Sequence, residues 1–173
     1  MKVLSRLNIK TKAATDTGKY KPGEFGYLWT VIEGREDLEG KVWNGNFEVY
    51  NDEFSPDSPK ITSLRGCPKE VKGSFYCHNL GLTSLEGAPE KVGKDFMCHA
   101  NKLTSLKGGP KEVGKYYSCM NNKLTSLEGA PKEVASFNCS NNKLTTLKYA
   151  PDVSRNFFCN NNQLVTLRSE ERR

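Results

Sequence analysis

The chain has 173 residues, of which 36% are hydrophobic and 27% charged, and its formal net charge is +6. No apolar run approaches the roughly 20 residues of a membrane span, and the first residues lack the apolar core of a secretory signal. We therefore expect no membrane partner, and we predict a cytoplasmic protein whose six cysteines are thiols.

Residues 1–60 are the less regular part of the chain, and we interpret them as a small N-terminal cap of α+β or β structure. Residues 27–32 are rich in β-forming residues and predict a strand, whereas residues 1–12 suit a helix or a strand. Residues 38–51 resemble a degenerate coil of the repeat that follows, and residues 52–59 are expected to form a connecting loop. The core positions of that coil would be filled by Val42, Phe47, Val49 and Asn51.

From residue 61 onward the sequence repeats with a period of 20–21 residues. Five cysteines mark the period, at separations of 21, 21, 20 and 20 residues: Cys77, Cys98, Cys119, Cys139 and Cys159. Metal clusters and disulfide frameworks do not space their sulfurs in this way, whereas stacked structural repeats do. We predict a solenoid of five full coils and a partial one over residues 61–167, followed by a charged tail at residues 168–173.

Residues 82–102 show what each position of the repeat does. Phe96 and Cys98 are two residues apart, so both point inward from one short strand. Asn101 is expected to turn the chain out of that strand, and the Leu-Thr-Ser-Leu segment refills the interior. The Gly-Ala-Pro segment disfavours a helix and predicts an extended, irregular convex side, where Val92 closes the core. The predicted fold is therefore a mainly β solenoid with one parallel strand per coil.

The pattern Leu-Thr-Ser-Leu-x-Gly-Ala-Pro, followed by Phe-x-Cys-x-x-Asn-x-Leu, resembles the short bacterial-type leucine-rich repeats. It is most similar to uncharacterised leucine-rich-repeat proteins of tailed phages and bacteria. The resemblance covers residues 61–167 and implies a leucine-rich-repeat solenoid. Some effector proteins of that class carry a ubiquitin-ligase domain after the repeats, but only six residues follow Leu167 here, so we do not expect that activity. A phage origin would imply residence in the host cytoplasm and inhibition of a host defence protein.

No motif in the sequence predicts catalysis, a cofactor or a metal site. The cysteines of the ladder face inward, where parallel stacking keeps neighbouring Cβ atoms near 4.8 Å, too far apart for a disulfide, and a linear ladder cannot surround zinc. Cys67 stands where other repeats have Ala or Gly, and we expect an inert, semi-buried thiol there. His78 and His99 share one outward column without a third ligand. We therefore predict that the chain is not an enzyme.

The outward positions of the strands do not repeat, although the core positions do. The predicted partner-binding residues are Tyr76, His78, Met97, His99, Tyr116, Met120, Asp95 and Phe158. Aromatic and Met side chains with few charges are typical of the centre of a protein interface. We predict a non-catalytic protein-binding module that docks a partner on a concave strand face, with Tyr76, Met97 and Tyr116 as anchors.

Basic residues form further columns and support an alternative function. They are Lys94, Lys102, Lys115, Lys123, Lys143 and Arg155. Columns of this kind would attract nucleic acid or an acidic partner, although such charges also keep a repeat surface soluble. A third hypothesis is a structural or oligomeric role. The last predicted strand, residues 156–160, has no polar cap, so either the charged tail covers it or two chains meet there as a homodimer.

Overall fold

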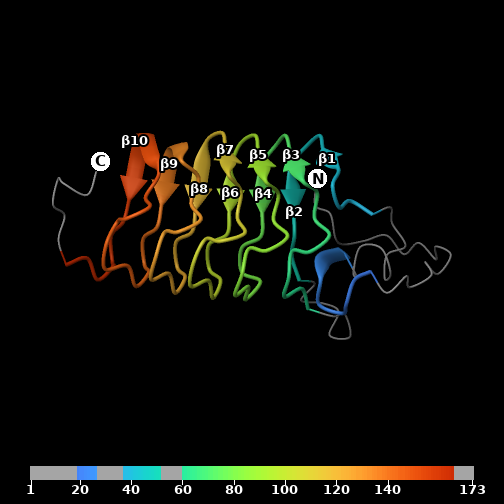
Figure 1. The fold of residues 1–173 in the computed structure, drawn as a ribbon, viewed down its shortest axis with the longest axis horizontal. Helices are drawn as coiled ribbons and strands as arrows, with labels where there is room; N and C mark the ends of the chain where they lie inside the picture. The colour runs from blue at the N-terminus through green and yellow to red at the C-terminus, as the bar shows by residue number, and fades with distance from the viewer. Residues whose placement is uncertain (1–18, 27–36, 52–59, 166–173) are drawn as a thin grey trace.

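The computed structural model describes residues 19–26, 37–51 and 60–165. The predictions for residues 1–12, 27–32 and 52–59, and for the charged tail, lie outside these ranges. In the described part the chain forms a mainly β solenoid, whose coils stand in a row (Figure 1). No helix there is long and apolar enough to cross a membrane.

Most coils contribute one strand to each of two parallel sheets, and the last two described coils contribute one longer strand each, to the larger sheet. The four-stranded sheet contains β1 (Val42–Trp43), β3 (Glu70–Val71), β5 (Lys91–Val92) and β7 (Glu112–Val113), in that order. The six-stranded sheet is made by β2 (Phe47–Glu48), β4 (Phe75–Tyr76), β6 (Phe96–Met97), β8 (Tyr116–Ser118), β9 (Glu133–Asn138) and β10 (Asp152–Phe158). Equivalent residues pair in register, as Phe75 does with Phe96. Parallel strands in a solenoid are therefore confirmed.

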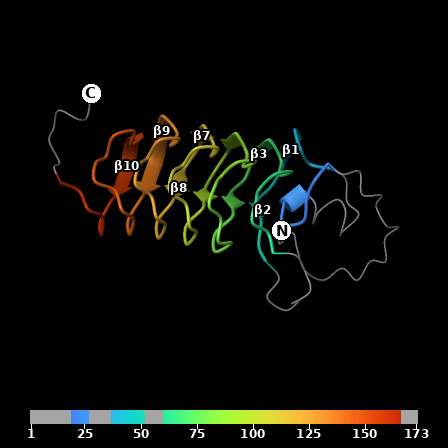
Figure 2. The same ribbon diagram turned by 60° about the horizontal axis from the view of Figure 1, so that its bottom comes forward.

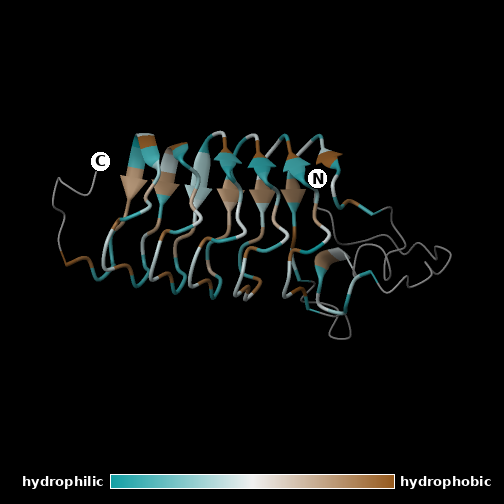
Figure 3. Ribbon diagram, viewed as in Figure 1, coloured by the Kyte–Doolittle hydropathy of each residue, from teal (hydrophilic) through white to brown (hydrophobic). Residues whose placement is uncertain are grey.

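The smaller sheet corrects the prediction of an irregular back. The valines expected to close the core lie in short strands, with Val71 paired to Val92 and Val92 to Val113. Pairing arises because in-register stacking brings the backbones of successive coils together, whatever their side chains. In Figure 3, β3, β5 and β7 of this sheet are coloured as hydrophilic, whereas β1 is coloured as hydrophobic.

A corner separates the two strands of the earlier coils. Glycine occupies it because a Cβ on Gly93 would lie 2.2 Å from the carbonyl oxygen of Lys72, and one on Gly114 would lie 2.2 Å from that of Gly93. The next coil has one residue fewer between Val134 and Phe137, and there the two strands merge into β9. The extra residue returns in β10 and is accommodated as an irregularity in its pairing with β9.

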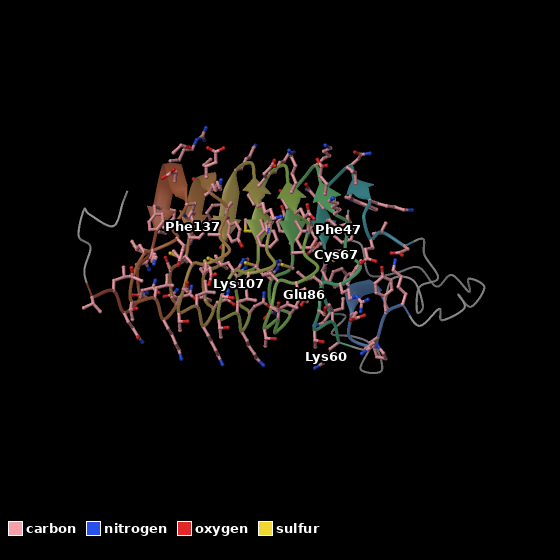
Figure 4. The ribbon with its side chains drawn as sticks, viewed as in Figure 1. Phe47, Lys60, Cys67, Glu86, Lys107 and Phe137 are labelled. Carbon is pink, nitrogen blue, oxygen red and sulfur yellow. The ribbon has the colours of Figure 1, made fainter. Side chains whose placement is uncertain are left out.

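A column of aromatic rings fills the centre of the stack. Its neighbouring ring centroids are 4.9 to 5.9 Å apart, through Phe47, Phe75, Phe96, Tyr117, Phe137 and Phe157. Figure 4 labels Phe47 and Phe137, near the two ends of this column. The ladder cysteines lie beside the rings, and Cys77, Cys98, Cys119 and Cys139 are buried free thiols. The predicted inward direction of both columns is confirmed.

The asparagine column joins the coils by side-chain hydrogen bonds. Asn101 Oδ1 accepts from the backbone N–H groups of Leu80 and Leu82, both at 3.0 Å. Its amide donates to the carbonyl oxygens of Cys77 and Cys98, at 2.9 and 3.0 Å. The column repeats at Asn122, Asn142 and Asn162. The turn itself is made one position earlier, where the backbone is left-handed at Asn79, Ala100, Asn121, Asn141 and Asn161.

At the N-terminal end, residues 19–26 pack on the first coil. The ring of Phe25 meets that of Phe47 edge-on at 5.5 Å, and both side chains are fully buried. Trp43, rather than the predicted Val42, is in register with Val71. Val42 is instead half-exposed, because adjacent strand residues point to opposite faces.

One core position shows how coils differ in their packing. Tyr117 replaces the phenylalanine of other coils, and its buried hydroxyl lies beside the Cys98 thiol. A thiol is a weak hydrogen-bond partner, and the hydroxyl makes no hydrogen bond of normal geometry with a described residue. Gly109 stands where neighbouring repeats carry alanine, and a Cβ there would lie 3.1 Å from that hydroxyl. The small residue therefore makes room for the tyrosine.

Replacing Tyr117 with phenylalanine is expected to raise the free energy of unfolding by about 1 kcal/mol, because a buried polar group without a good partner is removed. Gly109→Ala is expected to destabilise the wild-type chain more than the Tyr117→Phe variant. Urea denaturation of the two single variants and the double variant measures this coupling. Equal costs of Gly109→Ala in both backgrounds would contradict the proposed contact.

Candidate functional site

The outward side chains of the six-stranded sheet form what we call the strand-face patch: Tyr76, His78, Met97, His99, Tyr116 and Met120. All six are half-buried, so each is packed against neighbours while keeping an accessible surface. The coils stand in a nearly straight row in both views (Figures 1 and 2). We expected a concave surface, but this stacking makes the strand face nearly flat along the row.

The two histidines form the centre of one half of the patch. Their rings are parallel, with centroids 4.7 Å apart and planes inclined by 6°, and Tyr76 meets His78 edge-on at 6.5 Å. Burial lowers the pKa of His99, and a positive charge on His78 would lower it further. The Nδ1 atoms of both rings are buried and have no hydrogen-bond partner among the described residues. The stacked pair therefore presents a flat ring surface, and the lowered pKa of His99 favours its neutral ring.

The other half of the patch is held together by a residue that the sequence analysis missed. The Asn138 amide donates to the Tyr116 hydroxyl at 3.1 Å and approaches Met120 Sδ at 3.5 Å. Ser118 lies between Tyr116 and Met120 in the sequence, and it is buried. Asn138 stands in the same outward column as Tyr76 and Met97, so the repeat alignment could have identified it as part of this surface.

Tyr50 extends the patch towards the N-terminal end. The N–H of Val49 donates to the carbonyl of Tyr76 at 2.8 Å, so Tyr50 falls in the column of His78. Tyr50 is half-buried, and its buried hydroxyl has no hydrogen-bond partner in the part of the chain that the structure describes. The sequence analysis aligned Phe47 and Val49 with the Phe and Cys columns. Continuing that alignment by one residue would have placed Tyr50 in the outward column.

The last two predicted partner-binding residues occupy different settings. The Ser74 hydroxyl donates to the Asp95 carboxylate at 3.2 Å, which ties Asp95 into the sheet beside the patch. Phe158 is 46% exposed, but Ser118 and Asn138 separate it from Met97 along their shared column. The structure therefore does not bring Phe158 together with the patch.

Basic side chains border the strand face on two sides. Lys94 and Lys115 precede the face on their coils, and Lys102, Lys123 and Lys143 follow it beyond the turn. These five lysines and Arg155 are exposed, and none forms an ion pair with another described residue. Elsewhere lysines are paired across coils, at 2.6 Å for Lys91 with Glu112 and 3.0 Å for Lys107 with Glu128. Lysines without an ion pair to a described residue thus border the face, although exposed Lys111 and Lys132 elsewhere on the coils also form none.

The cysteines have the properties of core residues. Burial raises the pKa of Cys67, Cys77, Cys98 and Cys119, and it raises that of Cys139 to about 12. A thiol that stays protonated is a poor nucleophile and a poor metal ligand. Cys67 is fully buried rather than semi-buried. Within the described ranges, no three His, Cys, Asp or Glu side chains are grouped to hold a metal ion.

Comparison of the chain with protein-family models, with curated proteins and with solved structures returns no match.

Proposed function

We propose that this protein is a non-catalytic binding module that docks a protein partner on its strand face. The observation that carries the proposal is the strand-face patch itself. Aromatic and Met side chains converge there on adjacent coils, and the rings of His78 and His99 stack on each other. Contiguous apolar surface of this kind is typical of a contact site.

The proposal includes the type of fold and its setting. The Leu-x-x-Leu segments and the asparagine column support a leucine-rich-repeat solenoid, and the packing of Phe25 on Phe47 supports an N-terminal cap. The similarity of the repeats to phage and bacterial repeat proteins supports a role in the cytoplasm of a host cell. There the chain would inhibit a host protein by covering its surface.

Capture of partners from cells that express the protein tests the proposal. Alanine at Tyr76, Met97 and Tyr116 is expected to weaken binding by about thirtyfold or more, since an interface anchor contributes about 2 kcal/mol. Tyr149→Ala is the matched control, because it removes an exposed aromatic ring outside the patch. Equal retention of the partner by the triple variant and the control would contradict docking on the strand face.

The unpaired lysines support a second candidate, in which the bordering columns bind nucleic acid or an acidic partner. In that case alanine at Lys102, Lys123 and Lys143 would abolish binding, and the affinity would fall steeply with salt concentration. Docking through the patch predicts only a mild dependence on salt. A salt titration of wild-type and both triple variants therefore separates the two functions.

A further inference from the structure

The corner between β1 and β2 carries the only Asn-Gly pair of the sequence, Asn44–Gly45. The backbone nitrogen of a residue can attack the side-chain amide of a preceding asparagine, and glycine allows the closest approach because it has no Cβ. Asn44 is exposed, and its side chain makes no hydrogen bond with a described residue. The N–H of Gly45 makes none either. Both reacting groups are therefore free of competing hydrogen bonds in the described part of the chain.

The asparagines of the core column show the opposite arrangement. Asn101 is buried, and its amide is fixed by the hydrogen bonds described above. The N–H that follows it, of Lys102, donates to the carbonyl of Leu82 at 2.8 Å. A nitrogen held in this way cannot turn towards the preceding side chain. The same backbone bond recurs after the other asparagines of the column, at Lys123, Lys143 and Gln163.

The described residues leave room for a side chain at position 45. A Cβ on Gly45 would lie 3.6 Å from Trp43 Nε1, an ordinary contact, and the backbone of Gly45 is not left-handed. At the equivalent position of the next coil, a Cβ on Gly73 would lie only 2.5 Å from the carbonyl oxygen of Gly45. Alanine can therefore replace Gly45 without displacing the neighbouring coil, and its Cβ would hinder attack by the backbone nitrogen.

We propose that Asn44–Gly45 is a site of spontaneous covalent modification, at which Asn44 is converted to aspartate and isoaspartate in the folded protein. The Gly45 nitrogen loses its proton to water and forms a bond to Cγ of Asn44. The C–N bond of the side-chain amide breaks, and its nitrogen takes up a proton and leaves as ammonia. Water then opens the resulting succinimide at one of its two carbonyls. One opening gives aspartate, and the other gives isoaspartate, whose backbone runs through Cβ and Cγ.

Isoaspartate would loosen the contact between the first two coils of the stack. It lengthens the backbone by one methylene immediately before Gly45, whose carbonyl accepts from the N–H of Gly73 at 3.1 Å. The next residue is Asn46, and its Oδ1 accepts from the N–H of Ser74 at 2.9 Å. Displacing these two acceptors opens both N–H groups to exchange with solvent. Aspartate keeps the regular backbone, so it leaves both hydrogen bonds in place.

Incubation of the full chain at mildly alkaline pH, followed by peptide mapping with mass spectrometry, tests the proposal. The peptide containing Asn44 is expected to gain the mass difference between an amide and a carboxyl group before peptides from the core column do. Enzymatic methylation of the isoaspartyl carboxylate identifies the rearranged product. Gly45→Ala should slow the conversion by about tenfold or more, because attack requires close alignment of the two groups. An unchanged Asn44, under conditions that convert an isolated peptide of residues 41–48, overturns the proposal.

Two controls test the folded state and the structural effect. Gly81→Ala is destabilising through its positive φ of 76°, and it should leave the rate at Asn44 unchanged. A rate that rises with the unfolded fraction would show that Asn44 reacts only in the unfolded chain, against the proposal. Hydrogen exchange at Gly73 and Ser74 should be faster in the isoaspartate product than in Asn44→Asp, which reproduces the other product. Equal exchange in both would rule out the loosening of the coils.

Discussion

Replacing Gly129 with alanine is expected to lower the free energy of unfolding by about 3 kcal/mol or more. Gly129 has a φ of 97°, a left-handed conformation that is costly for residues with a Cβ. The added Cβ would also lie 2.4 Å from the carbonyl carbon of Leu106 and the nitrogen of Lys107, on the preceding coil. The two coils would have to separate. Urea denaturation followed by circular dichroism measures the loss.

Gly81→Ala is the matched control for this variant. Gly81 also has a positive φ, of 76°, but no atom lies within 4 Å of the position of its Cβ. It is expected to lose only the conformational term, about 1–2 kcal/mol. If both variants lose the same free energy, the close approach of the coils at Gly129 contributes nothing to stability.

Asn142→Ala is expected to cost about 2–4 kcal/mol, because it leaves several buried backbone groups without partners. Asn142 Oδ1 accepts from the N–H of Leu124 at 3.0 Å. Its amide donates to the carbonyl oxygens of Cys119 and Cys139, at 3.1 and 3.0 Å. Alanine can replace none of these bonds, and the site is too buried for water to do so easily. The same denaturation measurement applies.

Asn162→Ala provides the comparison within the same column. Asn162 makes the corresponding bonds to Leu144, Cys139 and Cys159, but it is only half-buried in the last described coil. Water can form hydrogen bonds with some of the backbone groups that lose the Asn162 side chain, so a smaller loss of stability is expected. A loss as large as that of Asn142→Ala would show that burial does not set the strength of the column.

The core could be predicted because its chemistry repeats. An aromatic residue and a cysteine two positions later recur from Cys77 to Cys159, and the period of two residues in a strand fixes their direction. The second sheet could not be predicted in this way, because its pairing depends on backbone contacts between coils. The error at Val42 had an available signal: Trp43 precedes Phe47 by four residues, as Val71 precedes Phe75.

The strand-face patch was predictable as a set of outward columns, but its internal contacts were not. The hydrogen bond from Asn138 to Tyr116 depends on how far two side chains reach across neighbouring coils. The stacking of His78 on His99 follows from the in-register pairing of their coils, which the period does predict. The hydrogen bond between Ser74 and Asp95 likewise joins side chains of adjacent coils and depends on their rotamers.

The asparagine column has a consequence for how the molecule unfolds. Each asparagine bonds only to its own coil and the one before it, so the stack behaves as a one-dimensional array of nearest-neighbour couplings. The terminal coil with a single neighbour should fray first, and amide exchange should slow progressively towards the middle coils. Unfolding would then advance through the array one coil at a time, starting from the terminal coil.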